Sequence, residues 1–234
     1  MKEAGLAELS ALIDAVRRRA GAPATRTLRR EVEVAEPARL YLVSRTSHLA
    51  EGWCDRVPAL ELAGDGGRTE LAEAVREAGR ALGVDVVWES PADVIPLPAG
   101  WEERSLTATI GQSDPGNALE PGVPAARTLR GGVEVRHFDP YSVVLRLIAR
   151  GDEPDYVAAL EYVLHGWVQP ARLEGLLSEV VPRMTNQTLA QDPAEFRRKF
   201  KGLRQLYLRS HAVYSPGGTR AGEAVSFGVT LPGT

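Results

Sequence analysis

The feature that most constrains the fold is a change of hydrophobic pattern at Asp139. Before it, short apolar runs rich in β-branched and aromatic residues alternate with polar or helical stretches. After it, the apolar stretches as far as Leu208 have the three-to-four-residue spacing of an amphipathic helix. The pattern therefore predicts an α+β protein, in which a small mixed β-sheet precedes a C-terminal helix bundle. The expected strands are 40–43, 57–63, 85–89, 105–110 and 133–138, and the expected later helices are 141–148, 156–164, 173–181 and 196–208.

The same pattern divides the chain into domains. We expect an α/β domain over residues 1–138, a helical domain over 139–210 and a tail over 211–234. Segment 112–132 is rich in Gly, Pro and Ala and has little to bury, so we expect a mobile insertion there, between two strands that pair as a hairpin. One more strand is predicted at 224–229.

Two helices are expected within the first domain. Apolar residues at helical spacing predict a surface helix that runs from the N-terminus to about Ala20. A second helical pattern begins after Thr69, which is a suitable N-cap, and Gly83 is a suitable terminator. The short segment 46–52 is expected to form one or two further helical turns.

Composition restricts the class of protein. The chain of 234 residues has no apolar run near the ~20 residues that a membrane-spanning helix needs, so we expect a soluble protein with no membrane partner. Its formal charge of −3 gives no global electrostatic argument for nucleic-acid binding. A single cysteine, Cys54, excludes an internal disulfide, and the start of the chain does not resemble a signal peptide. We therefore expect a cytoplasmic location.

Two glutamates on neighbouring predicted strands are the candidate catalytic and metal-binding residues. Ala59 and Glu61 share a face of one strand because side chains alternate along a strand, and Glu89 lies on the next strand. Carboxylates on adjacent strands can hold a divalent cation. The alternative interpretation is that Glu61 and Glu89 are solvated strand ends without a chemical role.

This region resembles the active site of the minimal nucleotidyltransferases. In that family one strand ends in Gly-Gly-Ser/Thr and the next carries Asp-x-Asp, and the segments 40–47 and 56–62 have the matching spacing. Ser44 and Arg45 stand at the two glycine positions, and Thr46 follows them. The resemblance implies that Ser44, Arg45 and Thr46 form the nucleotide-binding turn. Ala59 stands at the first aspartate and Glu61 at the second.

The resemblance extends into an uncharacterised bacterial branch of nucleotidyltransferase-fold proteins related to toxin and antitoxin nucleotidyltransferases. It rests on the segments 88–96, 100–105 and 138–141, and on Arg150-Gly151 with Asp155. Members of this branch typically carry a lysine where this chain has Leu147 and a second aspartate where it has Ala158. The polar positions thus depart from the pattern while the apolar frame is retained.

These departures imply a catalytically degenerate nucleotidyltransferase-like protein. The resemblance places it in a bacterial toxin–antitoxin, stress or phage-defence system, with a cognate protein partner and no cofactor. The alternative is an active metal-dependent nucleotidyltransferase that modifies RNA or protein, with Mg²⁺ and a nucleoside triphosphate held by Glu61 and Glu89. Whether the chain is an enzyme is left open by the sequence.

A third interpretation, a nucleic-acid-binding module, comes from the last predicted helix. Its apolar face alternates with a cluster of cations that could neutralise the phosphates of RNA or a nucleotide. A basic face that is merely solvated is the alternative. The candidate contact residues are Arg197, Arg198, Lys201 and Arg204.

Overall fold

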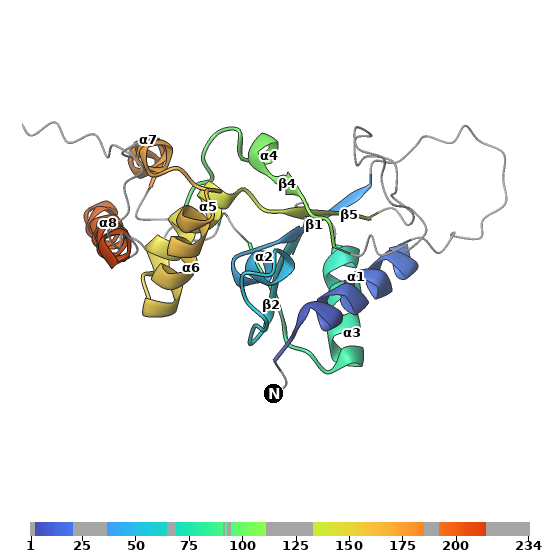
Figure 1. Cartoon of the computed structure of the whole chain (residues 1–234). Helices are drawn as coiled ribbons and strands as arrows, with labels where there is room; N and C mark the ends of the chain where they lie inside the picture. The colour runs from blue at the N-terminus through green and yellow to red at the C-terminus, as the bar shows by residue number, and fades with distance from the viewer. Residues whose placement is uncertain are drawn as a thin grey trace, which may run out of the picture. The chain divides into compact units, whose positions relative to one another are not determined.

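A five-stranded mixed sheet with N-terminal helices, followed by a helical region, forms the fold, so the α+β prediction is confirmed (Figure 1). This computed structural model describes residues 3–20, 37–64, 69–90, 92, 95–110, 133–184 and 192–213. Two units can be distinguished. The sheet unit comprises the described residues of 1–89 and 106–138, and the helical unit those of 90–105 and 139–234.

The sheet has the strand order β3-β2-β1-β5-β4. The strands are β1 (Ala38–Leu42), β2 (Leu60–Gly64), β3 (Val86–Trp88), β4 (Leu106–Thr107) and β5 (Val133–His137). Strand β1 is antiparallel to β2 and parallel to β5, and β2 is parallel to β3. Strands β4 and β5 pair antiparallel, as predicted for 105–110 and 133–138, although β4 has only two residues. The predicted insertion at 112–132 lies outside the described residues.

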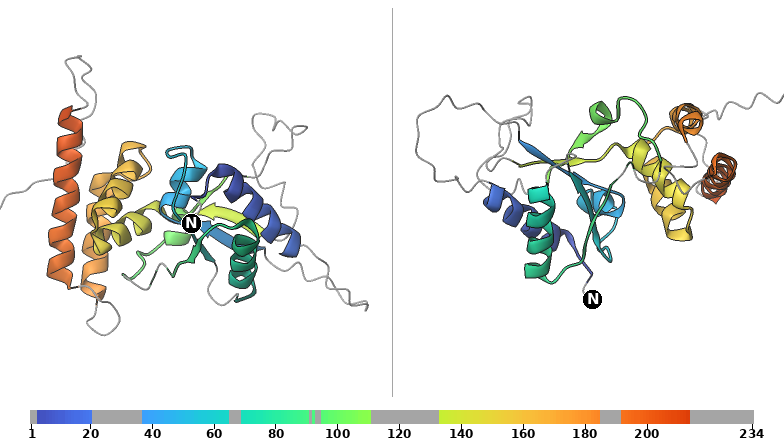
Figure 2. Two further views of the ribbon diagram at one scale, coloured as in Figure 1. Left: turned by 90° about the horizontal axis from the view of Figure 1, so that it is seen from below. Right: turned by 180° about the vertical axis from the view of Figure 1, so that it is seen from behind.

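One face of the sheet is covered by two helices, α1 (Leu6–Ala20) and α3 (Thr69–Leu82) (Figure 2). Both helices have the apolar stripe that the sequence predicts, and Gly83 follows α3 with a φ of +66°. Their apolar residues form one core with alternate residues of the strands. The core includes Leu9, Leu12, Ile13 and Val16 of α1, Leu71, Val75 and Ala78 of α3, and Leu40, Leu42, Leu60, Leu62, Val133 and Val135 of the strands.

The opposite face of the sheet carries the residues between these core positions. On β1 and β5 they are Arg39, Glu134 and Arg136, which are joined by ion pairs of 3.7 and 3.8 Å. Tyr41 is 2% exposed on this face, and its ring meets that of Phe138 edge to face, with 5.4 Å between centroids. This face therefore has charged, aromatic and carboxylate positions, whereas the face under α1 and α3 is apolar.

The helical unit contains five α-helices among its described residues. These are α4 (Trp101–Arg104), α5 (Pro140–Arg150), α6 (Glu153–Leu164), α7 (Pro170–Val180) and α8 (Pro193–Val213), with a 3₁₀ turn at Val181–Arg183. Proline stands in the first turn of α5, α6 and α7, where its missing N–H leaves no hydrogen bond unmade. Helices α7 and α8 lie side by side (Figure 2, left).

A buried ion pair fixes the start of α5. Asp139, fully buried, caps the helix by accepting hydrogen bonds from the Tyr141 amide (3.2 Å) and the Ser142 hydroxyl (2.7 Å). Arg104 donates to both carboxylate oxygens of Asp139, at 2.7 to 3.1 Å, and to the carbonyl of Ala99 at 2.6 Å. Losing one partner would leave a buried charge, so this pair strongly constrains how segment 95–105 packs on α5.

A second ion pair and a lysine fix the end of α5. Arg150 donates to both oxygens of Asp155 at 2.7 and 3.0 Å, and Gly151 ends the helix with a φ of +76°. Lys199 of α8 donates to the carbonyls of Ala149 and Arg150 at 2.6 and 2.9 Å. A positive charge at these carbonyls stabilises a helix C-terminus. The residues that carry the family resemblance in α5 therefore have structural partners.

No helix in the described part of the chain is long and apolar enough to cross a membrane. The predicted strand at 224–229 and the predicted tail from Tyr214 onward lie outside the described residues.

Candidate metal and nucleotide site on the sheet

The two candidate carboxylates lie on adjacent parallel strands. Glu61 of β2 is in register with Val87 of β3, and the ladder continues to the Glu89 amide, which donates to the Leu62 carbonyl at 2.7 Å. Glu89 follows Val87 by two residues, so alternation places Glu61, Val87 and Glu89 on the same face. It is the face opposite α1 and α3, because Leu60 and Leu62 belong to the core. Both glutamates are half-buried.

The short helix α2 (Arg45–Ala50) is anchored to the sheet beside Glu61. The Glu61 amide donates to the hydroxyl of Thr46 at 2.7 Å, and Ser47 donates its hydroxyl to the Leu42 carbonyl at 3.0 Å. Thr46 is fully buried, and Arg45 at the helix start is half-buried. The structure thus gives Thr46, predicted as a nucleotide contact, a role in joining the β1–α2 turn to β2.

The turn itself has an unusual backbone. Ser44, which is 3% exposed, has φ 52° and ψ −124°, and among the described residues it is the one non-glycine residue with a positive φ. Glycine reaches this region without a steric penalty, whereas a side chain there costs about 1–3 kcal/mol. The strain lies at a position where the resembled family has glycine.

Few carboxylates are present at the candidate metal site around Glu61. Ala59 directly precedes β2, at the position where the resemblance expects the first aspartate. In the described part of the chain, no three His, Cys, Asp or Glu side chains come together in a way that could hold a metal ion. The residues at hand for a divalent cation are Glu61 and Glu89, and a bound triphosphate would have to supply the remaining oxygens.

The sequence reasoning missed a contact between a buried histidine, on the helix-covered side of the sheet, and a more exposed glutamate. His137 at the end of β5 is 1% exposed, and its Nε2 lies 3.0 Å from Oε1 of Glu51. Burial lowers the pKa of His137 to about 4 and raises the pKa of Glu51 above its usual value, so desolvation outweighs the attraction between the two charged forms. No local signal could have paired residues that are so distant in the sequence.

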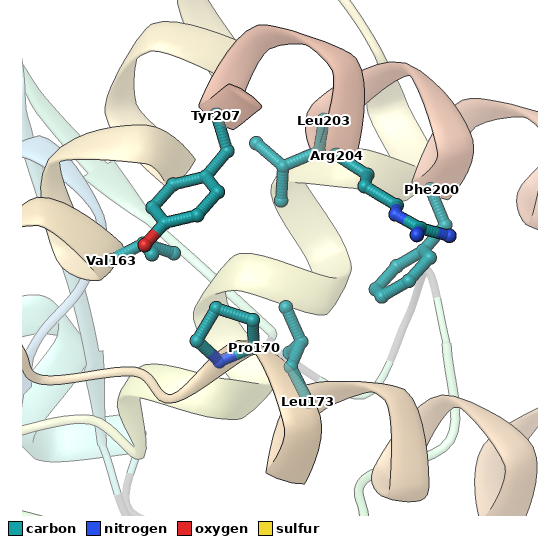
Figure 3. Close-up of a pocket in the computed structure, with 7 residues that line it drawn as sticks. All are labelled: Val163, Pro170, Leu173, Phe200, Leu203, Arg204 and Tyr207. Carbon is teal, nitrogen blue, oxygen red and sulfur yellow. The ribbon is translucent and has the colours of Figure 1, made fainter. Parts of the chain in front are cut away.

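The basic residues of α8 do not form one uniform face. Of the four candidate contact residues, Arg197, Arg198 and Lys201 are exposed. Arg204 is half-buried and lies at the edge of a small apolar cavity between α6, α7 and α8 (Figure 3). The cavity encloses about 10 Å³, roughly the space for one water molecule, so it is too small for an organic ligand. Its lining is Val163, Pro170, Leu173, Phe200, Leu203, Arg204 and Tyr207.

Comparison with known proteins adds no relative. The chain matches no protein-family model, no curated protein and no solved structure at a significant level.

Proposed function

We propose that this chain is a nucleotidyltransferase-like protein that has lost the transfer chemistry and acts as a protein partner in a bacterial toxin–antitoxin, stress or phage-defence system. The observation that carries the proposal is the turn at Ser44. Its backbone has the conformation that glycine favours, at the place where the resembled family has its first glycine, yet it carries a side chain and is followed by Arg45. This conformation supports the interpretation of the turn as a phosphate-binding turn whose glycines are replaced by residues that would obstruct a phosphate.

The carboxylates support the same proposal. Nucleotidyl transfer uses divalent ions to stabilise the attacking and leaving oxygens, and the resembled family holds them with three carboxylates. With Ala59 at the first position, Glu61 and Glu89 remain. Loss of one carboxylate removes a few kcal/mol of charge stabilisation from a metal site, which is enough to abolish efficient turnover.

The partner role rests on the resemblance and on the retained frame. The motif residues with structural partners, Arg104 with Asp139 and Arg150 with Asp155, maintain the fold. A protein that keeps its frame while its chemistry is lost can still present a binding surface. We therefore expect the partner to be the protein encoded beside it, with which it forms a complex.

The second candidate is an active enzyme that uses Mg²⁺ and a nucleoside triphosphate to modify RNA or protein. It is favoured by the placement of Glu61 and Glu89 on one face of neighbouring strands, because Mg²⁺ in phosphate sites is often held by one or two carboxylates and the phosphates themselves.

Incubation with each labelled nucleoside triphosphate and Mg²⁺ or Mn²⁺, followed by mass spectrometry of RNA and protein acceptors, separates the two candidates. We expect no transfer. The decisive control is Glu61→Gln beside Glu73→Gln, an exposed glutamate of α3 that serves as the matched substitution. Transfer by the native chain that Glu61→Gln abolishes and Glu73→Gln leaves intact would establish the enzyme instead.

The partner role is tested by co-expression with the product of the adjacent gene. We expect a stable complex on size-exclusion chromatography and relief of any growth defect that the neighbour causes. If the two proteins elute separately and growth is unchanged, the partner role is wrong, whatever the outcome of the transfer assay.

A further inference from the structure

One helix of this protein has a strong local excess of positive charge. Helix α8 contains six Arg or Lys residues and one Glu, a net charge of +5. The whole chain has a net charge of −3, so the remainder carries −8. A cationic helix in a chain that is otherwise acidic indicates a local anion-binding surface. Solubility alone would not require the positive charges to gather on one helix.

The cations of α8 have two different roles. Lys199 is turned inward and caps α5, and Arg204 lies over the small apolar cavity (Figure 3). The remaining four, Arg197, Arg198, Lys201 and Arg209, are exposed, and we call them the basic strip.

The basic strip has few charge partners of its own. Arg198 lies 3.9 Å from Glu195, with 79% of its side chain exposed. No ion pair with a described residue is seen for Arg197, Lys201 or Arg209. Within the described part of the chain, no carboxylate therefore competes with an external anion for these three side chains.

The basic strip lies on one side of the helix. At 1.5 Å and 100° per residue, its members span about 18 Å along α8 and an arc of about 120°. The opposite side is anchored in the helical unit by Phe196, Phe200, Leu203 and Tyr207, each 8% exposed or less. The strip is thus a rigid row of cations with a length of several phosphate groups.

We propose that the basic strip binds the sugar-phosphate backbone of double-stranded DNA. Three of its four residues are arginines, which bind phosphate oxygens in a bidentate manner. Proteins that bind single strands stack the bases on aromatic side chains. Phe196, Phe200 and Tyr207 of α8 are buried and cannot do so. An α-helix that enters the major groove of B-DNA can reach the phosphates that border the groove, whereas the major groove of duplex RNA is too narrow to admit it.

This inference is independent of the proposed loss of transfer chemistry, because it uses no residue of the sheet. Its test is fluorescence anisotropy with a labelled 20-base-pair DNA duplex between 50 and 200 mM salt. With four phosphate contacts, binding should weaken by about 150-fold over this range, since log K falls by about 0.9 per contact for each tenfold rise in salt.

The test variant is Arg197→Gln with Lys201→Gln and Arg209→Gln. We expect at least tenfold weaker binding at 50 mM salt, and only a three- to fourfold salt effect from the one contact that remains. The matched control removes three exposed arginines elsewhere, Arg56→Gln with Arg76→Gln and Arg80→Gln, and should bind nearly as the native chain does. Arg197→Lys with Arg209→Lys should retain binding within about threefold.

Several outcomes would overturn the proposal. They are no binding to the duplex at 50 mM salt, equal losses in the test and control variants, or tighter binding to single-stranded DNA, duplex RNA or an acidic polypeptide than to the DNA duplex. Because the substituted residues are exposed, circular dichroism and melting temperature should be unchanged in every variant, which separates lost contacts from lost folding.

Discussion

Ser44 adopts a backbone conformation that its own side chain disfavours. Its φ of 52° with ψ of −124° lies in a region that glycine occupies freely. Residue 44 nevertheless keeps this conformation, because α2 is anchored by the hydroxyls of Thr46 and Ser47 and the chain must turn sharply after β1. Backbone strain of this kind is common at functional sites.

The strain at Ser44 can be measured. We expect Ser44→Gly to be more stable than Ser44→Ala by about 1–2 kcal/mol in urea unfolding, because both lose the hydroxyl and only alanine retains the strained Cβ. At the exposed residue Glu73 of α3, the Gly variant should instead be less stable than the Ala variant by about 1 kcal/mol. Equal stabilities at residue 44 would show that the turn is unstrained.

His137 makes the free energy of unfolding depend on pH. Its pKa is about 4 in the folded chain and about 6.5 when unfolded, so the unfolded state binds the proton first. Stability is therefore full above about pH 6.5 and decreases as pH falls towards 4, by about 3 kcal/mol in total. The raised pKa of Glu51 acts in the opposite direction, since its folded form takes up a proton at higher pH than the unfolded form.

We predict that His137→Gln removes most of this acid sensitivity. Free energies of unfolding from urea titrations at pH 7.5, 5.5 and 4.0 should show a native chain that loses stability steeply and a variant that loses much less. Glu51→Gln should steepen the acid loss, because the opposing contribution disappears. Parallel curves for the native chain and His137→Gln would mean that the imidazole is protonated while buried.

At the scale of elements, Lys199 joins α8 to α5, whereas Lys201 of the same helix does not. Lys199 is 20% exposed and donates to two carbonyls at the end of α5, and its stem lies against Gly151, where a Cβ would approach Lys199 Cδ to 2.8 Å. Lys201, two residues later, is exposed. The two residues thus form a matched pair for separating structural from surface charge.

We expect Lys199→Ala to destabilise the protein by about 1–2 kcal/mol, since it removes two hydrogen bonds and a favourable charge at a helix C-terminus. Lys201→Ala should change stability by less than about 0.5 kcal/mol. Thermal unfolding by circular dichroism measures both. Similar melting temperatures for the two variants would contradict the capping role.

On the scale of the whole molecule, the positions that depart from the family pattern fall in different units. Ser44, Ala59 and Glu61 belong to the sheet unit, whereas Leu147 and Ala158 belong to the helical unit and are 1% and 2% exposed. A charge introduced at either of the latter two would have to enter an apolar interior. Introducing the residues of the resembled family at these positions would therefore affect stability as well as chemistry.

We predict that Ser44→Gly, Arg45→Gly and Ala59→Asp together produce metal-dependent nucleotide binding without efficient turnover. Calorimetry with Mg²⁺ and ATP should detect binding by the triple variant and none by the native chain. Adding Leu147→Lys and Ala158→Asp should lower the free energy of unfolding by several kcal/mol, unless the two new charges pair. Rapid transfer by the triple variant would show that Leu147 does not limit the reaction.

The sequence by itself predicted most of the elements of this protein, although it missed the short helix α4 and overestimated the length of β4. Alternation and helical spacing are local properties, so they predicted the strands around Leu40, Leu62 and Val135 and the helices from Pro140 onward, with errors of a few residues at their ends. The candidate carboxylates followed from the same alternation, because residues two apart on a strand share a face.

Tertiary structure alone decided which distant groups meet. The parallel pairing of β1 with β5, the contact of His137 with Glu51, the salt bridge of Arg104 with Asp139 and the inward turn of Lys199 leave no periodic signal. The φ of Ser44 and the division of α8 into inward and outward cations were likewise unpredictable. Each depends on how separate segments pack, and packing energies are sums over neighbours that a local pattern does not specify.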